Sequence, residues 1–207
     1  MKITHFLAIF FAISTFNAQA FEVVDGFFLQ PSLTVEYSAP HMSDGGVNGS
    51  FKTNIFEKQL KNFENIAVGV HFRVHKYVGI NANWAQTDLD NGALQNYSVA
   101  LKPRFKMDQF NVSALFFAPI VEDSLFELFA ETGVSDMNSK LVFFESSGTY
   151  NYQKTHETHA FIGAGFQLAP FEDSTDAFRM SVQRYIGKLA LLDTNYTTIR
   201  IGYVKSF

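Results

Sequence analysis

The chain has 207 residues, a formal net charge of −4 and no cysteine, so it has neither a disulfide framework nor a thiolate metal site. It also lacks the basic footprint of nucleic-acid binding, and we expect no nucleic-acid partner. Phe alone accounts for 24 residues, whereas charged residues make up only 17% of the chain. Soluble domains usually carry about 25% charged residues, so the composition indicates a surface that does not face water.

The first twenty residues have the form of a secretory signal peptide. Lys2 supplies a positive start, residues 6–16 are mostly apolar, and Ala18-Gln19-Ala20 has the small-x-small form of a cleavage site. The alternative is a retained membrane anchor, but the apolar stretch is shorter than the roughly 20 residues that span a bilayer. We therefore expect cleavage after Ala20, which leaves residues 21–207 as one exported domain.

The rest of the chain shows repeated alternation of apolar and polar residues, which predicts strands with two chemically different faces. In the second stretch, for example, Val68 and Val70 alternate with Gly69 and His71. Eight stretches share the pattern, in chain order residues 27–37, 65–75, 78–84, 110–116, 126–134, 159–168, 178–183 and 198–207.

The links between these stretches alternate between short and long. Outer-membrane barrels have tight periplasmic turns and longer external loops. The short links are residues 75–76, 119–124 and 171–175, and the others are the long 38–62, 87–109 and 136–158 and the intermediate 188–195. The pattern therefore predicts an all-β fold, a transmembrane antiparallel up-and-down β-barrel of eight strands.

One further segment, residues 95–107, alternates as well as the eight stretches do. We interpret it as β-structure that rises out of the membrane within the second long link. Pairing it with a weak strand near residues 142–152 would instead give ten strands. Phe143-Phe144 and Ser146-Ser147 break the alternation there, which favours eight.

The polar faces of the strands combine small residues with charges of both signs, which suits a narrow lumen. A soluble lipocalin-type barrel, with its apolar face inward, is the alternative. An eight-stranded barrel is only just wide enough for its interior side chains to fill it, so charges inside it should pair. The residues expected to form these lumen pairs are Glu36, Arg73, Glu127, Glu131, Arg179 and Arg200.

Residues 110–134, FNVSALFFAPIVEDSLFELFAETGV, resemble the fourth strand, Pro-containing periplasmic turn and fifth strand of the OmpA-like family of eight-stranded outer-membrane barrels. Its small relatives include OmpX, the opacity proteins and accessory colonisation factors. The ending RIGYVKSF is similar to the family's assembly signal, carried here by Gly202, Tyr203 and Phe207, with Lys205 departing from it at an apolar position. We expect no OmpA-type peptidoglycan-binding domain after it.

This resemblance implies a protein of the bacterial outer membrane that contacts outer-membrane lipid and lipopolysaccharide. It also implies delivery by periplasmic chaperones and insertion by the barrel-assembly machinery. Within the family, the length and the single-domain form resemble the colonisation-factor or adhesin-type members.

The sequence holds no clear catalytic motif. His156-Glu-Thr-His159 lacks the His-Glu-x-x-His spacing of a helical zinc site, and no Gly-x-Ser-x-Gly elbow occurs. We expect no catalytic residue, metal or cofactor. Binding residues concentrate on loops, so residues 38–62 and 136–158 are the predicted surface for adhesion to a host surface or matrix, or for envelope interaction. A lipid A-modifying enzyme and a narrow channel are the alternatives.

Overall fold

The computed structural model describes residues 21–24, 27–43, 65–89, 104–119, 125–144, 150–169, 175–191 and 194–207. The expected signal peptide, residues 1–20, lies outside the described residues. The strands are β1 (Phe21–Val24), β2 (Phe27–Ser43), β3 (Asn65–His75), β4 (Val78–Leu89), β5 (Arg104–Pro119), β6 (Phe126–Phe144), β7 (Tyr150–Leu168), β8 (Asp176–Leu189) and β9 (Thr194–Ser206).

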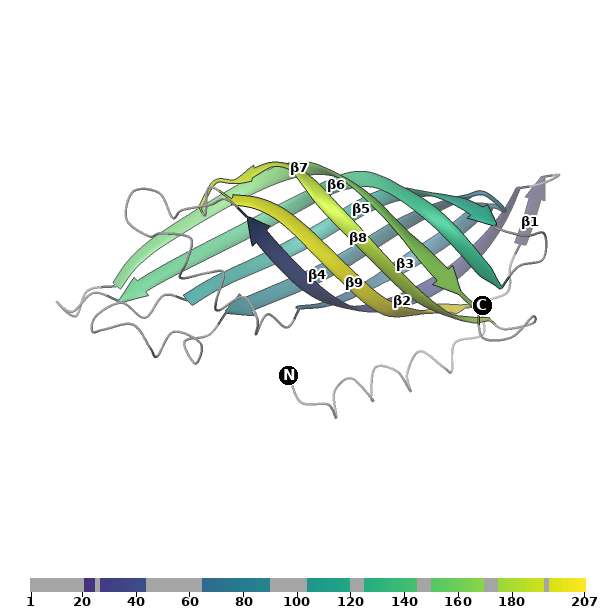
Figure 1. Ribbon diagram of the computed structural model, residues 1–207, viewed down its shortest axis with the longest axis horizontal. Coiled ribbons are helices and arrows are strands. Elements are labelled where there is room, and N and C mark those ends of the chain that lie inside the picture. Colours follow the sequence, from purple (N-terminus) through teal and green to yellow (C-terminus); the bar gives the residue numbers. More distant parts are fainter. Residues whose placement is uncertain are drawn as a thin grey trace.

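Each strand pairs antiparallel with the next one in the chain, and β2 also pairs with β9. Strands β2 to β9 therefore close into an eight-stranded up-and-down barrel, as the alternation predicts (Figure 1). The short β1 was not predicted, and it pairs with residues 27–29 at the start of β2. Within the part of the chain that is described, no helix is long and apolar enough to cross a bilayer.

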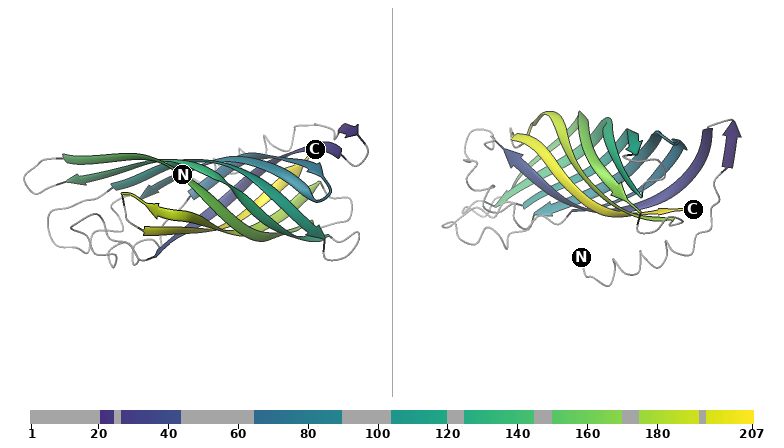
Figure 2. Two further views of the ribbon diagram at one scale, coloured as in Figure 1. Left: turned by 90° about the horizontal axis from the view of Figure 1, so that it is seen from above. Right: turned by 45° about the vertical axis from the view of Figure 1, so that its right-hand side comes forward.

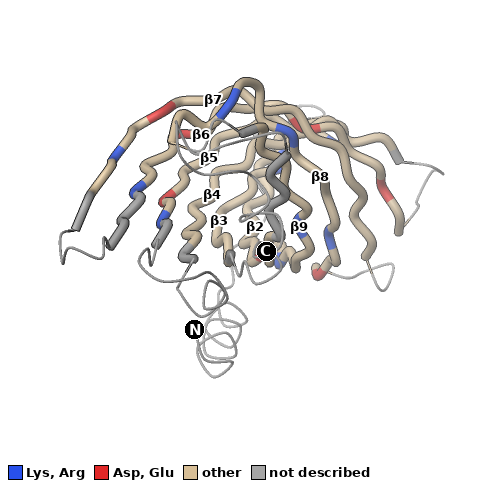
Figure 3. The backbone as a smooth tube through the Cα atoms, turned by 60° about the vertical axis from the view of Figure 1, so that its left-hand side comes forward, with Lys and Arg blue, Asp and Glu red and all other residues tan. Residues whose placement is uncertain are grey.

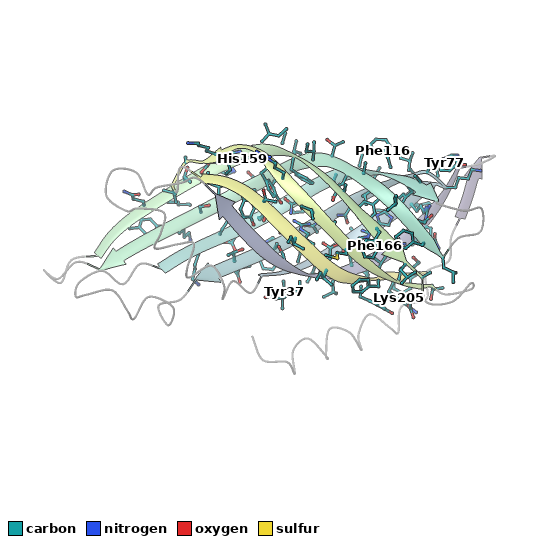
Figure 4. The ribbon with its side chains drawn as sticks, in the orientation of Figure 1. Tyr37, Tyr77, Phe116, His159, Phe166 and Lys205 are labelled. Carbon is teal, nitrogen blue, oxygen red and sulfur yellow. The ribbon has the colours of Figure 1, made fainter. Side chains whose placement is uncertain are left out.

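The period-two alternation places apolar side chains outside the barrel and small polar side chains inside it. Trp84 and Phe110 keep 47% and 50% of their surface exposed, whereas their polar neighbours Asn83 and Asn111 are buried. Figure 4 shows Tyr37 and Phe116 pointing away from the barrel wall on opposite sides. Water would penalise so much exposed apolar surface, so this face contacts lipid and the lipocalin-type alternative is wrong.

The strand ends that meet the short links and the strand ends that meet the longer links lie at opposite ends of the barrel (Figure 2). The turn at Lys76–Tyr77 and the links 120–125 and 169–175 join the strands at one end, which we take as periplasmic because outer-membrane barrels keep their tight turns there. The strands that meet the longer links reach further at the other, extracellular end.

The predicted loop at residues 136–158 is wrong, because most of it is strand. β6 and β7 pair without a break from Phe126 opposite Leu168 to Phe144 opposite Tyr150. Their outermost parts, residues 136–144 and 150–158, are called the β6–β7 extension below. The alternation was not recognised in this range because polar residues occur on both faces, Asp136 and Asn138 on the outer face and Ser139 and Glu157 on the inner face.

The other two long links are also shorter than predicted. β2 continues to Ser43, and residues 44–62 of the first predicted loop lie outside the described residues. In the ambiguous segment 95–107, residues 104–107 are the start of β5 and pair with residues 139–142 of β6. These four residues lengthen an existing strand, and residues 95–103 lie outside the described residues. The barrel closes with eight strands, so the ten-strand alternative is wrong.

Aromatic rings inside the barrel fit against glycines of the wall. A Cβ on Gly165 would lie 2.7 Å from the ring of Phe129, and one on Gly133 would lie 2.8 Å from the ring of Phe161. Phe129 and Phe161 are 4% and 0% exposed. The glycines therefore make room for interior rings, which the alternation alone does not predict because each ring follows or precedes an outward apolar residue.

Candidate functional site

The periplasmic half of the lumen contains a two-point ion pair between β3 and β6. Arg73 Nη1 donates to Glu127 Oε2 at 2.9 Å, and Arg73 Nη2 donates to Glu127 Oε1 at 2.6 Å. The guanidinium also lies 4.3 Å from the centre of the Phe117 ring. Two parallel charge-assisted bonds fix both position and orientation, so this pair forms a rigid contact across the lumen.

Arg179 has different partners, although its side chain is buried. Its Nε and Nη2 donate to Gln167 Oε1 at 3.2 and 2.8 Å, and its guanidinium lies 5.4 Å from the centre of the Phe129 ring. The Arg179 guanidinium therefore contacts the amide oxygen of Gln167 and the face of the Phe129 ring, and not a carboxylate.

A second network fills the extracellular half of the lumen. Arg200 Nη1 lies 3.5 Å from Glu36 Oε2 and 3.3 Å from Asn83 Oδ1, and Arg200 Nη2 donates to the Tyr185 hydroxyl at 3.4 Å. Gln109 Nε2 donates to the same hydroxyl at 2.6 Å. Arg200 is among the largest fully buried side chains, so several strands share in satisfying one charge.

Glu131 also lies in this network but bonds to neutral groups. Ser113 Oγ donates to Glu131 Oε1 at 2.5 Å, and Gln183 Nε2 donates to Glu131 Oε2 at 2.6 Å. Of the six residues predicted to pair in the lumen, the structure thus brings together Arg73 with Glu127 and Glu36 with Arg200. Arg179 and Glu131 bond instead to amides and a hydroxyl.

The interior partners that sequence reasoning missed are Gln109, Gln167, Gln183 and Tyr185. All four occupy the inward-facing positions of the period-two alternation, so the alternation alone could have placed them in the lumen. They were overlooked because they carry no formal charge.

Apolar rings and methionines occupy the lumen alongside the polar groups. Tyr185 stands between Phe161 and Tyr196, with ring centroids 5.3 and 4.7 Å apart. Met107 and Met137 are 0% exposed. Together with the hydrogen-bonded network, these side chains pack the described part of the lumen.

The histidine pair singled out from the sequence is divided between the two faces of β7. His156 is exposed and pairs with Asp136 of β6 on the outer side. His159 faces inward, where its Nε2 lies 3.0 Å from Glu157 Oε2. Among the described residues, no three His, Cys, Asp or Glu side chains are grouped as a metal site requires.

The pairing of β7 with β8 ends at Phe161, which lies opposite Tyr185. Beyond that point, His159 and Glu157 of β7 bond to the end of β8. His159 Nδ1 lies 3.1 Å from the carbonyl oxygen of Ile186, and the Ala190 amide donates to Glu157 at 2.9 Å. Gly187 between them has a φ of 97°, a conformation that side chains disfavour. These two bonds replace the backbone ladder at this position.

The residues of the predicted assembly signal lie on β9, whose last residues are at the periplasmic end. The Phe207 amide donates to the Pro31 carbonyl at 3.1 Å, which secures the chain end against β2. Lys205 lies at the same end of the barrel (Figure 4), 2.7 Å from Asp176 and 3.0 Å from the Thr175 hydroxyl. Recognition of Gly202, Tyr203 and Phe207 by the assembly machinery stays a prediction.

An up-and-down barrel with lipid-facing apolar side chains and an enclosed polar network is a transmembrane β-barrel of the outer-membrane type. Comparison with solved structures gives the same fold. The structure of Ail, the attachment invasion locus protein of Yersinia pestis, in complex with the heparin analogue sucrose octasulfate, matches with a TM-score of 0.57 and 17% identity over 86% of this chain and 99% of that chain.

Two other small barrels also match. Neisserial surface protein A gives a TM-score of 0.55 with 11% identity over 86% of this chain and 97% of that chain. The N-terminal β-barrel domain of Pseudomonas aeruginosa OprF gives 0.53 with 11% identity over 86% and 99%. No protein-family profile matches the sequence, and a search of curated proteins finds no match. The likeness therefore shows the fold of the small eight-stranded outer-membrane barrels.

Proposed function

We propose that the protein is a non-catalytic outer-membrane surface protein that supports adhesion or envelope interaction through the β6–β7 extension and its neighbouring loops. The observation that carries the proposal is the unbroken pairing of β6 with β7 beyond the lipid-facing band. On the outer face, apolar Val134 is followed by Asp136, Asn138 and Lys140. A paired, polar platform of this kind presents loop residues rigidly outside the membrane.

The similar fold of Ail supports a role in adhesion, because that protein is named for attachment and invasion and its crystal structure contains a heparin analogue. For the present chain, the corresponding partners are outer-membrane lipid and a host surface or matrix. Export with cleavage after Ala20, periplasmic chaperones and the barrel-assembly machinery complete the proposed route to the outer membrane.

The packed lumen favours a surface role over the narrow channel. Fully buried Phe161 of β7 and Tyr196 and Arg200 of β9 extend into the interior. A continuous water path would have to pass these side chains, so refolded protein in a planar bilayer should show no large, steady conductance. Such a conductance in a well-folded sample would instead favour the channel.

The adhesion proposal is tested by shortening the β6–β7 extension. Residues 137–157 are replaced by a two-residue Asn-Gly turn, which joins Asp136 to Thr158, a directly opposed pair. The matched control exchanges the outward side chains of the extension, Asn138 and Tyr152 included, for Ser and keeps its length. We expect the shortened barrel to fold, shown by its heat-modifiable gel mobility, and to lose binding of expressing cells to host cells or matrix.

Two outcomes would contradict the proposal. Undiminished adhesion by a folded, shortened barrel would remove the β6–β7 extension as the binding element. A change in the lipid A mass spectrum on expression would favour the lipid A-modifying enzyme.

A further inference from the structure

Within the described part of the chain, six polar side chains of the lumen have a buried atom without a hydrogen-bond partner. All six occupy inward-facing positions of their strands, and Asn83 and Arg200, for example, are only 1% and 2% exposed. The atoms are His71 Nδ1, Arg73 Nε, Asn81 Oδ1, Asn83 Nδ2, Tyr196 Oη and Arg200 Nε. They are called the unpartnered set below.

The unpartnered set lies on one side of the lumen. Its members belong to β3, β4 and β9, which β2 joins into one stretch of wall. Figure 3 shows β4, β3, β2 and β9 following one another around the barrel. On the other side, protein groups bond the interior amides, since Gln109 Nε2 donates to the Tyr185 hydroxyl and Gln183 Nε2 donates to Glu131. Protein atoms therefore satisfy the interior amides on the β5–β8 side and leave the β3–β4–β9 side incomplete.

The unpartnered atoms are also neighbours within the wall. Asn81 is the register partner of His71 across β3 and β4. Arg73 and Asn83 are the next inward positions on these two strands. Arg200 Nη1 of β9 lies 3.3 Å from Asn83 Oδ1. Successive inward positions of a strand are about 7 Å apart, a separation that one bridging molecule with two hydrogen bonds of about 2.8 Å each can span. The set therefore forms a connected line along the lumen.

The chemistry of these atoms defines the ligand that would bridge them. The Nε of Arg73 and of Arg200 and the Nδ2 of Asn83 can only donate, whereas Asn81 Oδ1 can only accept. The orientation of the Asn83 amide follows from its contacts, because its Oδ1 accepts from Asn111 Nδ2 at 2.7 Å and from Arg200. A ligand that serves the whole line must both accept and donate hydrogen bonds.

The ligand must also be uncharged. Three arginines and three glutamates line this part of the lumen, so their formal charges cancel. They are Arg73, Arg179, Arg200, Glu36, Glu127 and Glu131. An added ion would have no counter-charge, and an unbalanced charge is costly to bury in a closed interior. A small neutral molecule that accepts and donates meets both conditions.

We propose that the β3–β4–β9 side of the lumen binds water molecules that bridge the unpartnered set. A buried polar group without a partner destabilises the fold, and a buried water typically makes about three hydrogen bonds to such groups. One molecule accepts from Asn83 Nδ2 and Arg200 Nε and donates to Asn81 Oδ1. A neighbouring molecule links His71 with Arg73.

This water is a bound part of the core and not a path through the barrel. At the periplasmic end, the line stops at Arg73, which the two-point bond to Glu127 and the face of the Phe117 ring hold across the lumen. The lumen then has a hydrated side and a dry side. This property goes beyond the proposed surface function and does not depend on it.

Nuclear magnetic resonance of the mature protein, refolded in lipid nanodiscs, tests the proposal. Rotating-frame cross-peaks between water and side-chain N–H protons are recorded, and their sign separates direct contact from proton exchange. Two matched pairs are compared. Arg200 Nε–H is set against Arg179 Nε–H, and the Asn83 amide is set against the Gln183 amide, because the second member of each pair has a protein acceptor. We expect water contacts at Arg200 and Asn83 and none at Arg179 and Gln183.

Two results of this comparison would overturn the proposal. Without water contacts at Arg200 and Asn83, the unpartnered set would be dry. With equal contacts at all four groups, water would occupy both sides of the lumen.

A variant removes the acceptor of the proposed bridge. Asn81→Leu keeps a similar volume but offers no hydrogen bond, so the water cross-peak of Asn83 should fall to a small fraction of its wild-type intensity. The control is Ser38→Ala, which removes an interior hydroxyl that bonds to Thr198 and should leave this cross-peak unchanged. Heat-modifiable gel mobility shows whether each variant folds.

A cross-peak of wild-type intensity at Asn83 in folded Asn81→Leu would contradict the bridge. The comparison of the two matched pairs needs no substitution, so it decides the proposal even where Asn81→Leu does not fold.

Discussion

The protein contains two kinds of ion contact, and their surroundings are opposite. In the lumen, the side chains of Arg200 and Glu36 are 2% and 5% exposed. In the β6–β7 extension, those of His156 and Asp136 are 61% and 46% exposed. Water screens the second pair and not the first. Buried charges are thus committed to holding strands together, whereas charges of the extension stay accessible to ligands.

The largest effect is expected where a buried charge loses its partner. Glu36→Ala removes the carboxylate beside Arg200 and leaves the cation with neutral neighbours in the lumen. Breaking a buried pair in this way costs about 3–5 kcal/mol. Urea unfolding in lipid vesicles, followed by tryptophan fluorescence, measures the free energy of unfolding. Glu36→Gln is the matched control, and a loss under 1 kcal/mol for Glu36→Ala would contradict the role of the pair.

An intermediate effect is expected from the aromatic packing. Phe161→Ala removes a ring that is 0% exposed and lies 5.3 Å from Tyr185. Truncating a buried Phe costs about 3 kcal/mol when the surroundings do not collapse. The same unfolding measurement checks it. Phe161→Leu, which retains most of the volume, should lose much less, and equal losses for both variants would argue against a packed interior.

The smallest effect is expected in the β6–β7 extension. His156→Asn removes the partner of Asp136 on a surface that water reaches. Exposed pairs contribute about 0–1 kcal/mol, so the free energy of unfolding should change by less than 1 kcal/mol. A loss as large as that of Glu36→Ala would remove the distinction between the two regions.

The strands of the membrane-embedded wall were predictable from the sequence because each of the two faces has a single kind of environment. Lipid outside and a narrow lumen inside enforce strict alternation, as in Val68, Gly69, Val70 and His71. In the β6–β7 extension polar residues occur on both faces, such as outward Asn138 and inward Thr155, so no period in the sequence marks a strand there. The length of β6 and β7 in the extension is therefore evident only from the pairing of the two strands in the structure.

The sequence predicted which charged residues face the lumen, but not which of them contact one another. Parity assigned Glu36, Arg73, Glu127, Glu131, Arg179 and Arg200 to the interior. Which charges touch depends on their height and angular position around the barrel, which follow from strand register. Gln167 of β7 is the register partner of Arg179 of β8, whereas Gln183 of β8 reaches Glu131 of β6 across Gly163 of the intervening β7.

The departure of β8 from β7 above Phe161 leaves one side of β7 without a neighbouring strand among the described residues. The Ala169 amide donates toward β6, and the β6–β7 register has no bulge, so odd-numbered residues of β7 direct their backbone groups to β6. Even-numbered residues from 152 to 158 direct theirs the other way. The N–H and C=O groups of every second residue therefore point away from the ladder along this stretch, while those of the residues between are bonded to β6.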